Sequence, residues 1–285
     1  MSNLASNATR AIAQNAQYIQ EKWTRDVQQP FNKVLQAKNL VQDRSGLIAD
    51  GGDILNIPFA ATVNARAKAA STAVTYDSPD GSPVVMNIDK HYYVAVLIED
   101  IAKIQSSVDL KSVFQERMAE GLARQIDTDL MSLYGSAGAT VSGGATVTDA
   151  SVIALVTGFD TADVPMDQRR GIVGANTKAD FLGINKYVAY DQTGKEGKAV
   201  DGSNGLVASL YNMDIYYSGN VQTSTTGRNM FFHKKAINVA SQQAPKFEME
   251  YSVDQIGTKT VLHTVYGVGV ERASAFQQLT RTTAP

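Results

Sequence analysis

The chain has 285 residues and a formal net charge of -2, because 26 lysines and arginines nearly balance 28 aspartates and glutamates. This balance disfavours proteins that attract nucleic acid or anionic lipid through a general basic field. The lack of cysteine excludes disulfides, thiolate metal sites and a cysteine nucleophile. Nowhere do about 18 apolar residues occur together, as a membrane-spanning helix requires. We therefore expect a soluble protein made in a cytoplasm, with one large or two medium domains.

The N-terminal segment is polar and carries a narrow helical stripe. Its apolar residues recur at spacings of three and four: Ile12, Ala16, Ile19 and Trp23. Pro30 then interrupts the pattern. Such a stripe cannot form a core alone, so it is either an ordinary amphipathic helix on the main domain or an arm that docks on a partner subunit.

The next segment predicts a long hairpin. Residues 53–65 form one extended run, and Val84–Ile98 alternates apolar and polar residues as a strand does. The stretch between them contains the turn residues Pro79, Asp80, Gly81 and Pro83. Val84–Ile98 would span roughly 50 Å as one strand, much more than the usual strand length. Because the middle of the hairpin, Ala69–Ala73, is small and weakly apolar, we expect another molecule to cover its outer half.

A single long helix is predicted directly after the hairpin. Asp109 is a suitable cap, and Gly135 ends the pattern. The apolar residues recur at helical spacing: Leu110, Val113, Phe114, Met118, Leu122, Ile126, Leu130, Leu133 and Tyr134. The helix would be close to 40 Å long. Asp127 and Asp129 are two residues apart and face different directions, so we expect each to be solvated or paired with Arg124.

The remaining sequence predicts a mixed α/β region. The glycine-rich stretch 135–150 is expected to be a flexible joint. A helix over 150–159, a buried strand over 169–175 and a short helix capped by Asn176 follow. Polar, glycine-rich residues 189–205 predict a mobile surface loop. The strand candidates after it are 213–218, 229–240, 247–252 and 259–273.

Motifs for catalysis or cofactor binding are missing. Gly267 and Gly269 supply two glycines of a dinucleotide fingerprint, but the third is lacking and no helix and second strand can follow so near the C-terminus. His91, His233 and His263 are far apart in sequence and are expected to be separate strand residues. The basic clusters "HKK" and "DQRR" are ordinary charge placements unless the fold brings them together. We therefore predict no catalytic, cofactor-binding or metal-binding residues.

The order of these parts, together with four short phrases, points to a known family. The phrases are "IEDI" at 98–101, "ARQIDTDL" at 123–130, "VPMDQR" at 164–169 and "MDIYYSGNV" at 213–221. In this order they resemble the major capsid proteins of tailed double-stranded DNA bacteriophages, which have the Hong Kong 97 fold. The resemblance covers nearly the whole chain.

The resemblance implies an α+β fold with four parts. They would be an N-terminal arm (1–50), an extended hairpin loop (51–98), a peripheral domain (99–142 and 244–285) with a spine helix (109–134), and an axial domain (143–243). The extended loop would lie across a neighbouring subunit, with contacts from Arg66, Lys68, Val74, Tyr76 and Asp77. Lys195 and Lys198 would lie on a loop near the capsomer axis. Some family members cross-link a loop lysine to a neighbour, but no motif here transfers that reaction to Lys68.

The implied function is structural. The chain would assemble through pentamers and hexamers into an icosahedral virion capsid around phage DNA, which it would contact non-specifically, after synthesis in the host cytoplasm. The implied partners are further copies of the chain, a separate scaffolding protein, a portal and a candidate cement or decoration protein, with no membrane. Because the chain begins directly with a short arm, we expect separate scaffolding or a mature form. The alternatives are an encapsulin-like nanocompartment shell protein, which shares the fold, and a cytosolic α/β enzyme.

Overall fold

The computed structural model describes residues 33–49, 51–59, 63–76, 81, 83–101, 110–188, 206–222 and 226–282. Several sequence predictions fall outside these ranges: the apolar stripe before Pro30, the helix cap Asp109, the contact residue Asp77, and the predicted loop 189–205 with Lys195 and Lys198. In the described ranges, no helix combines the length and apolar character needed to cross a membrane.

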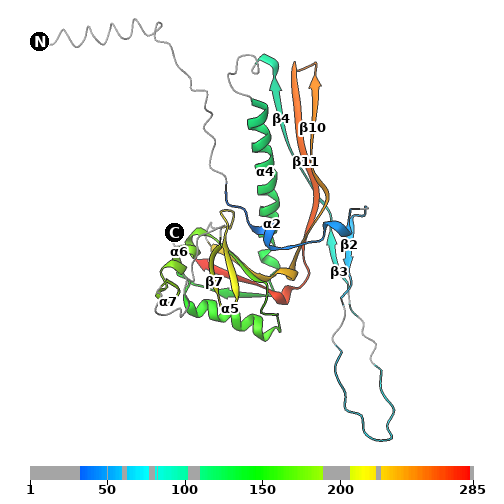
Figure 1. The fold of residues 1–285 in the computed structure, drawn as a ribbon, viewed down its shortest axis with the longest axis vertical. Helices are drawn as coiled ribbons and strands as arrows, with labels where there is room; N and C mark the ends of the chain where they lie inside the picture. Colours follow the sequence, from blue (N-terminus) through cyan, green and yellow to red (C-terminus); the bar gives the residue numbers. More distant parts are fainter. Residues whose placement is uncertain are drawn as a thin grey trace, which may run out of the picture.

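Three sheets organise the described chain (Figure 1). The four-stranded sheet has the order β1-β10-β11-β4, with β1 (Gln42–Asp43), β10 (Ile237–Ser252), β11 (Gly257–Val270) and β4 (Lys90–Glu99). The six-stranded sheet has the order β5-β12-β9-β6-β8-β7. Its strands are β5 (Ala139–Ser142), β12 (Phe276–Thr282), β9 (Thr226–His233), β6 (Arg169–Val173), β8 (Met213–Tyr217) and β7 (Leu206–Leu210). The third sheet pairs β2 (Ile54–Ile57) with β3 (Val84–Asn87).

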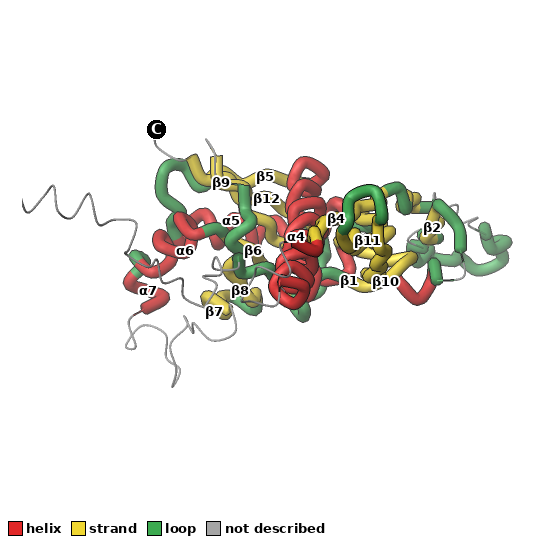
Figure 2. Tube along the Cα trace, turned by 90° about the horizontal axis from the view of Figure 1, so that it is seen from above, coloured by secondary structure: helices red, strands yellow, loops and turns green. Residues whose placement is uncertain are grey.

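The long helix α4 (Leu110–Ser132) confirms the prediction from the apolar spacing and continues into the 3₁₀ turn η3 (Leu133–Ser136). It lies between the two larger sheets (Figure 2). One part of its apolar stripe, Met118 and Leu122, packs with Leu262 of β11. The following turns, which include Ile126 and Leu130, belong to the main core. Because these contacts continue along the helix, α4 joins the two sheets.

The main core surrounds the six-stranded sheet. The helices of this region are α5 (Asp149–Thr161), α6 (Ala175–Leu182) and α7 (Asn185–Val188). Its fully buried aromatic side chains include Phe159, Phe181, Phe231, Phe232 and Phe276. The predicted helix after residue 149 and the buried strand at β6 are confirmed. Asn176 is not the cap of α6, because that helix begins at Ala175 with Gly174 as its N-cap.

The prediction of one strand from Val84 to Ile98 is wrong. The strand is broken at Ile88 and Asp89 into β3, which pairs with β2, and β4, which pairs with β11. The break is where the pairing partner changes: the Ile88 N–H donates to the carbonyl of Asp53, next to β2, whereas Lys90 pairs with Tyr266 of β11. The buried side chain of Ile88 packs in a small cluster with Met86 and Ala240. The excess length of this stretch is therefore divided between two sheets, and β4 forms an edge of the four-stranded sheet.

Two other segments differ from expectation. The predicted flexible joint contains β5, which pairs in parallel with β12. β12 also pairs with β9, so it lies inside the six-stranded sheet, whereas the sequence grouped residues 244–285 with the long helix. β5 and β12 are far apart in sequence, so no local sequence pattern predicts that they pair. The backbone hydrogen bonds of such a short strand are made only with its neighbours in the sheet.

Candidate assembly surfaces

The outer part of the extended loop (51–98), described here as residues 63–76, projects away from the rest of the molecule (Figure 1). Its apolar side chains lie in solvent, with Val74 57% exposed and Tyr76 89% exposed. Arg66 and Lys68 are also exposed. The structure therefore places the four described contact residues of the prediction along one protruding segment.

The tip of the extended loop is held by local bonds. The Thr72 hydroxyl donates a hydrogen bond of 2.6 Å to the carbonyl of Ala69, and Ser71 adopts a left-handed φ of 64°. The chain therefore turns at Ala70 and Ser71. Of the turn residues that the sequence singled out, Pro79 and Asp80 lie outside the described residues. Residues on both sides of this tip line a space of about 350 Å³, and no other element of the described chain borders it. The extended loop thus lacks a packed interior of its own.

Two glycines of β11 fix the base of the hairpin. A Cβ on Gly267 would overlap the carbonyl oxygen of Asn87, and one on Gly269 would come within 2.9 Å of the Met86 Cγ. The backbone of β11 therefore needs glycine at both positions to let β3 cross it closely. This steric role explains the "GVGV" pattern without a nucleotide.

The two aspartates of α4, Asp127 and Asp129, are buried, so the prediction that they are solvated or paired with Arg124 is wrong. Asp127 accepts a hydrogen bond of 2.8 Å from the backbone N–H of Ala37. Asp129 accepts one of 2.8 Å from the Tyr266 hydroxyl and lies 3.5 Å from the Lys90 ammonium group. Burial raises the pKa of Asp127, although the hydrogen bond from Ala37 opposes that shift.

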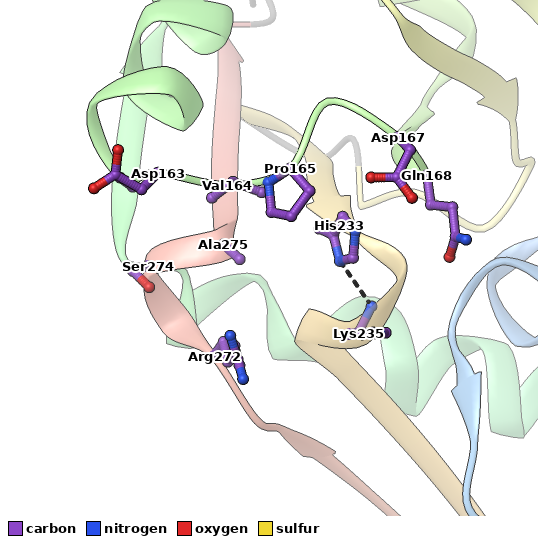
Figure 3. A pocket seen from close by; sticks show the side chains of 11 residues that line it. Asp163, Val164, Pro165, Asp167, Gln168, His233, Lys235, Arg272, Ser274 and Ala275 are labelled. Carbon is purple, nitrogen blue, oxygen red and sulfur yellow. Dashed lines mark hydrogen bonds between the residues drawn. The ribbon is translucent and has the colours of Figure 1, made fainter. Parts of the chain in front are cut away.

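The fold brings the "DQRR" and "HKK" clusters together around a pocket of about 250 Å³ (Figure 3). The backbone N–H of Lys235 donates to the Nδ1 atom of His233, and burial lowers the pKa of this histidine. Lys235 and Arg272 line the pocket together with Asp163 and Asp167. The two cations and two carboxylates balance, so the pocket has no net charge with which to select an ion.

Arg169, in the "VPMDQR" phrase, serves the fold. Its side chain is 2% exposed and donates hydrogen bonds to the Asp160 carboxylate and to the carbonyls of Val164 and Pro165. Its guanidinium group also lies over the Phe159 ring. The phrase therefore builds the turn between α5 and β6.

The structure joins two histidines that the sequence analysis kept apart. His91 Nε2 lies 3.4 Å from His263 Nδ1 on the exposed face of the four-stranded sheet. The two positions are close because β4 and β11 are neighbours, which no local spacing could indicate. In the described part of the chain, no group of three or more histidine, aspartate or glutamate side chains is placed to hold a metal ion.

A polar cluster fixes α7, which precedes residues 189–205. Asp149 accepts hydrogen bonds from Tyr187, Tyr211 and Lys186. Burial raises the pKa of Asp149, but the bonds from Tyr187 and Lys186 outweigh it, and the net shift is downward. The cluster thus joins the start of α5, α7 and the turn after β7.

These features describe a subunit built around exposed, elongated surfaces. A family model described as phage capsid protein matches residues 92–279, well over half of the chain. The chain belongs to this family of phage capsid proteins. Comparison with curated protein sequences finds no match.

Solved structures show the same fold. The structure titled Mycobacterium phage Che8 is 21% identical, with a TM-score of 0.79 over 92% of this chain and 97% of that one. The capsid of cyanophage P-SCSP1u is 16% identical, with a TM-score of 0.76 over 94% of both chains. The mature capsid of bacteriophage PhiM1 is 14% identical, with a TM-score of 0.75 over 94% of this chain and 93% of that one.

The fold expected from the sequence, α+β and of the Hong Kong 97 type, is therefore confirmed. The function is structural: the chain is a phage capsid protein, a component of the virion shell, which is assembled from many copies. The family match favours this function over the nanocompartment shell that the sequence also allowed.

Proposed function

We propose that this chain is the major capsid protein of its virion and assembles through pentamers and hexamers into an icosahedral shell around double-stranded DNA. In this proposal the extended loop lies across a neighbouring subunit, and Arg66, Lys68, Val74, Tyr76 and Asp77 make the contact. Lys195 and Lys198 lie near the capsomer axis. The domain boundaries follow the division into arm, extended loop, peripheral domain and axial domain described above, with β12 joined to the axial sheet.

The observation that carries the proposal is the exposure of the extended loop. Tyr76 is 89% exposed and Val74 is 57% exposed, and both lie on a segment that has no hydrophobic core of its own. Neighbouring exposed apolar side chains of this kind are unfavourable in an isolated subunit and mark a surface for contact with another protein. Contact with a second copy would remove this apolar surface from water and fill the space between the two sides of the loop. In a capsid, the neighbouring subunit would be that second copy.

The further partners belong to the same proposal. A separate scaffolding protein, a portal and a cement protein would act with the shell, and assembly would take place in the host cytoplasm. Contacts with packaged DNA would be non-specific. They would be confined to local basic side chains, because the formal charge of -2 provides no general basic field. The proposal includes no catalytic step.

Shortening the extended loop tests its role. Residues 66–82 would be deleted and the strands joined by an Asn-Gly type I′ turn, so that β2 and β3 can still pair. We expect a soluble subunit with nearly unchanged thermal unfolding that no longer forms shells in negative-stain microscopy. Shells of normal size would contradict the clamp, and loss of folding would mean that the extended loop belongs to the subunit's own core.

A further inference from the structure

Two histidines lie side by side on one face of the four-stranded sheet. His91 belongs to β4 and His263 to β11, and the Nε2 atom of the first lies 3.4 Å from the Nδ1 atom of the second. His91 pairs in register with Val265, and His263 with Tyr93, so the two histidines are diagonal neighbours on adjacent strands. Their ring centroids are 5.5 Å apart, and the ring planes meet at 67°. The sheet therefore holds one nitrogen of each ring close to the other.

This face of the sheet is open. The helix α4 packs against the opposite face, where Leu262 of β11 contacts Met118 and Leu122. Because successive side chains of a strand point to opposite faces, His263 is directed away from the helix. His91 is exposed, and His263 is partly exposed. An ion dissolved in water can therefore reach both rings.

The separation of the two nitrogens fits a shared metal ion. At 3.4 Å, the contact is longer than a usual hydrogen bond. Two nitrogens bound to a tetrahedral Zn²⁺, each at about 2.0–2.1 Å from the ion, are about 3.3–3.4 Å apart. Imidazole is a preferred ligand of zinc and copper ions. The χ2 torsion of histidine is broad, so both lone pairs can turn towards one ion.

The charges around the pair do not oppose a cation. Lys246 of β10 pairs in register with His263, but its ammonium group lies 2.6 Å from the Glu248 carboxylate. The hydrogen bond from Lys246 lowers the pKa of Glu248, and the charge of His263 adds to this shift. The two charges on β10 therefore offset each other. Lys90 of β4 is directed to the opposite face, where it lies 3.5 Å from Asp129.

We propose that His91 and His263 bind one Zn²⁺, or a similar transition-metal ion that favours imidazole, and that this ion links the edge strand β4 to β11. In the part of the chain that the structure describes, no third histidine, aspartate or glutamate is placed to join the pair, so water fills the remaining positions. An ion that binds only the folded chain stabilises it, and here it stabilises the four-stranded sheet. The site lies within one subunit and does not depend on shell assembly.

Calorimetric titration of the smallest soluble species with zinc chloride tests the site. We expect one Zn²⁺ per chain. His91→Gln and His263→Gln should each weaken binding at least about ten-fold, because losing even an outer partner of a metal-bound histidine typically costs about 10–100-fold in affinity. Tyr93→Gln is the matched control, because it changes an exposed residue on the same strand and face, and it should leave the affinity unchanged.

Other ions test the imidazole chemistry. Cu²⁺ should bind the wild type more tightly than Zn²⁺ does, as it does at most nitrogen sites. Excess Mg²⁺, which prefers oxygen ligands, should not compete with Zn²⁺. Competition by Mg²⁺ would assign the binding to carboxylates and would overturn the proposal.

Thermal unfolding provides a second measurement on the same proteins. Zn²⁺ should raise the unfolding midpoint of the wild type and of Tyr93→Gln, but not that of His91→Gln or His263→Gln. Circular dichroism without zinc shows whether each variant is folded. A rise of the same size in all four proteins would place the ion elsewhere and would contradict the proposal.

Three further results would overturn the site. The first is a wild type that does not bind Zn²⁺. The second is binding that survives His91→Gln and is lost in His233→Gln, which would assign the ion to the third histidine of the chain. The third is one Zn²⁺ per two chains together with a zinc-dependent dimer in light scattering, which would mean that two subunits share the ion.

Discussion

Asp127, in the C-terminal third of α4, accepts a hydrogen bond of 2.8 Å from the backbone N–H of Ala37, which begins the short helix α2 (Ala37–Leu40). The same carboxylate lies 3.5 Å from the hydroxyl of Ser218, which follows β8. One buried side chain therefore joins the N-terminal part of the described chain, the long helix and the six-stranded sheet.

The burial of Asp127 predicts a pH-dependent contribution to stability. Because its pKa is raised in the folded state, its contribution is complete below the ordinary pKa of aspartate and is lost as the pH rises through the raised value. Replacing Asp127 with asparagine removes this titration. Thermal unfolding midpoints measured between about pH 4 and about pH 8 should show the wild type losing stability relative to Asp127→Asn as the pH rises. A constant difference would contradict the raised pKa.

The packing of α4 predicts unequal effects of substitution along one helix. Leu130 is 1% exposed, so Leu130→Ala should lower the free energy of unfolding by about 2–5 kcal/mol. Glu116 is exposed on the same helix, and Glu116→Ala should change it by less than about 0.5 kcal/mol. Chemical denaturation of both variants checks this. Similar midpoints would mean that the helix is rotated relative to its neighbours.

The exposed ring at position 76 predicts a separation of assembly from folding. Tyr76→Asp places a charge where the proposed contact removes water, so association should weaken while circular dichroism and the unfolding midpoint remain unchanged. Tyr76→Phe keeps the ring and is the control, which should still assemble. Light scattering measures the difference. If the aspartate variant assembled normally, Tyr76 would not lie in a subunit contact.

The close crossing of β3 over β11 predicts that Gly267 tolerates no side chain. Gly267→Ala should force the backbones of β11 and β3 apart, because the new Cβ would overlap the carbonyl oxygen of Asn87. Gly227→Ala in β9 is the matched control, since the nearest atom to its Cβ would be 3.5 Å away. We expect a clearly lower unfolding midpoint for Gly267→Ala and a near-normal one for Gly227→Ala. Equal midpoints would show that the hairpin base can shift freely.

Much of the fold was accessible from the sequence, because local patterns report local structure. The three- and four-residue spacing of α4 predicted a helix close to its observed length, and the alternation after Val84 correctly indicated extended chain. The break at Ile88 was hidden, because the alternation continues across it while the pairing partner changes from β2 to β11.

The contacts between distant segments could not be predicted in this way. The approach of His91 to His263 depends on the register of two neighbouring strands. The burial of Asp127 depends on a backbone N–H, which carries no sequence signal at all. The extended loop was recognised because its small and polar residues cannot form a core, whereas its tip at Ser71 depends on a local bond from Thr72.

The position of α4 between the two sheets has a mechanical consequence. The helix packs sideways against β11 through Met118 and Leu122 and enters the main core through Ile126 and Leu130. A pull applied along its axis would have to slide many interdigitated side chains at once, and densely packed interiors resist such displacement. In a curved wall under outward pressure, tension passing through this subunit would be distributed along about 35 Å of helix instead of being concentrated at one joint.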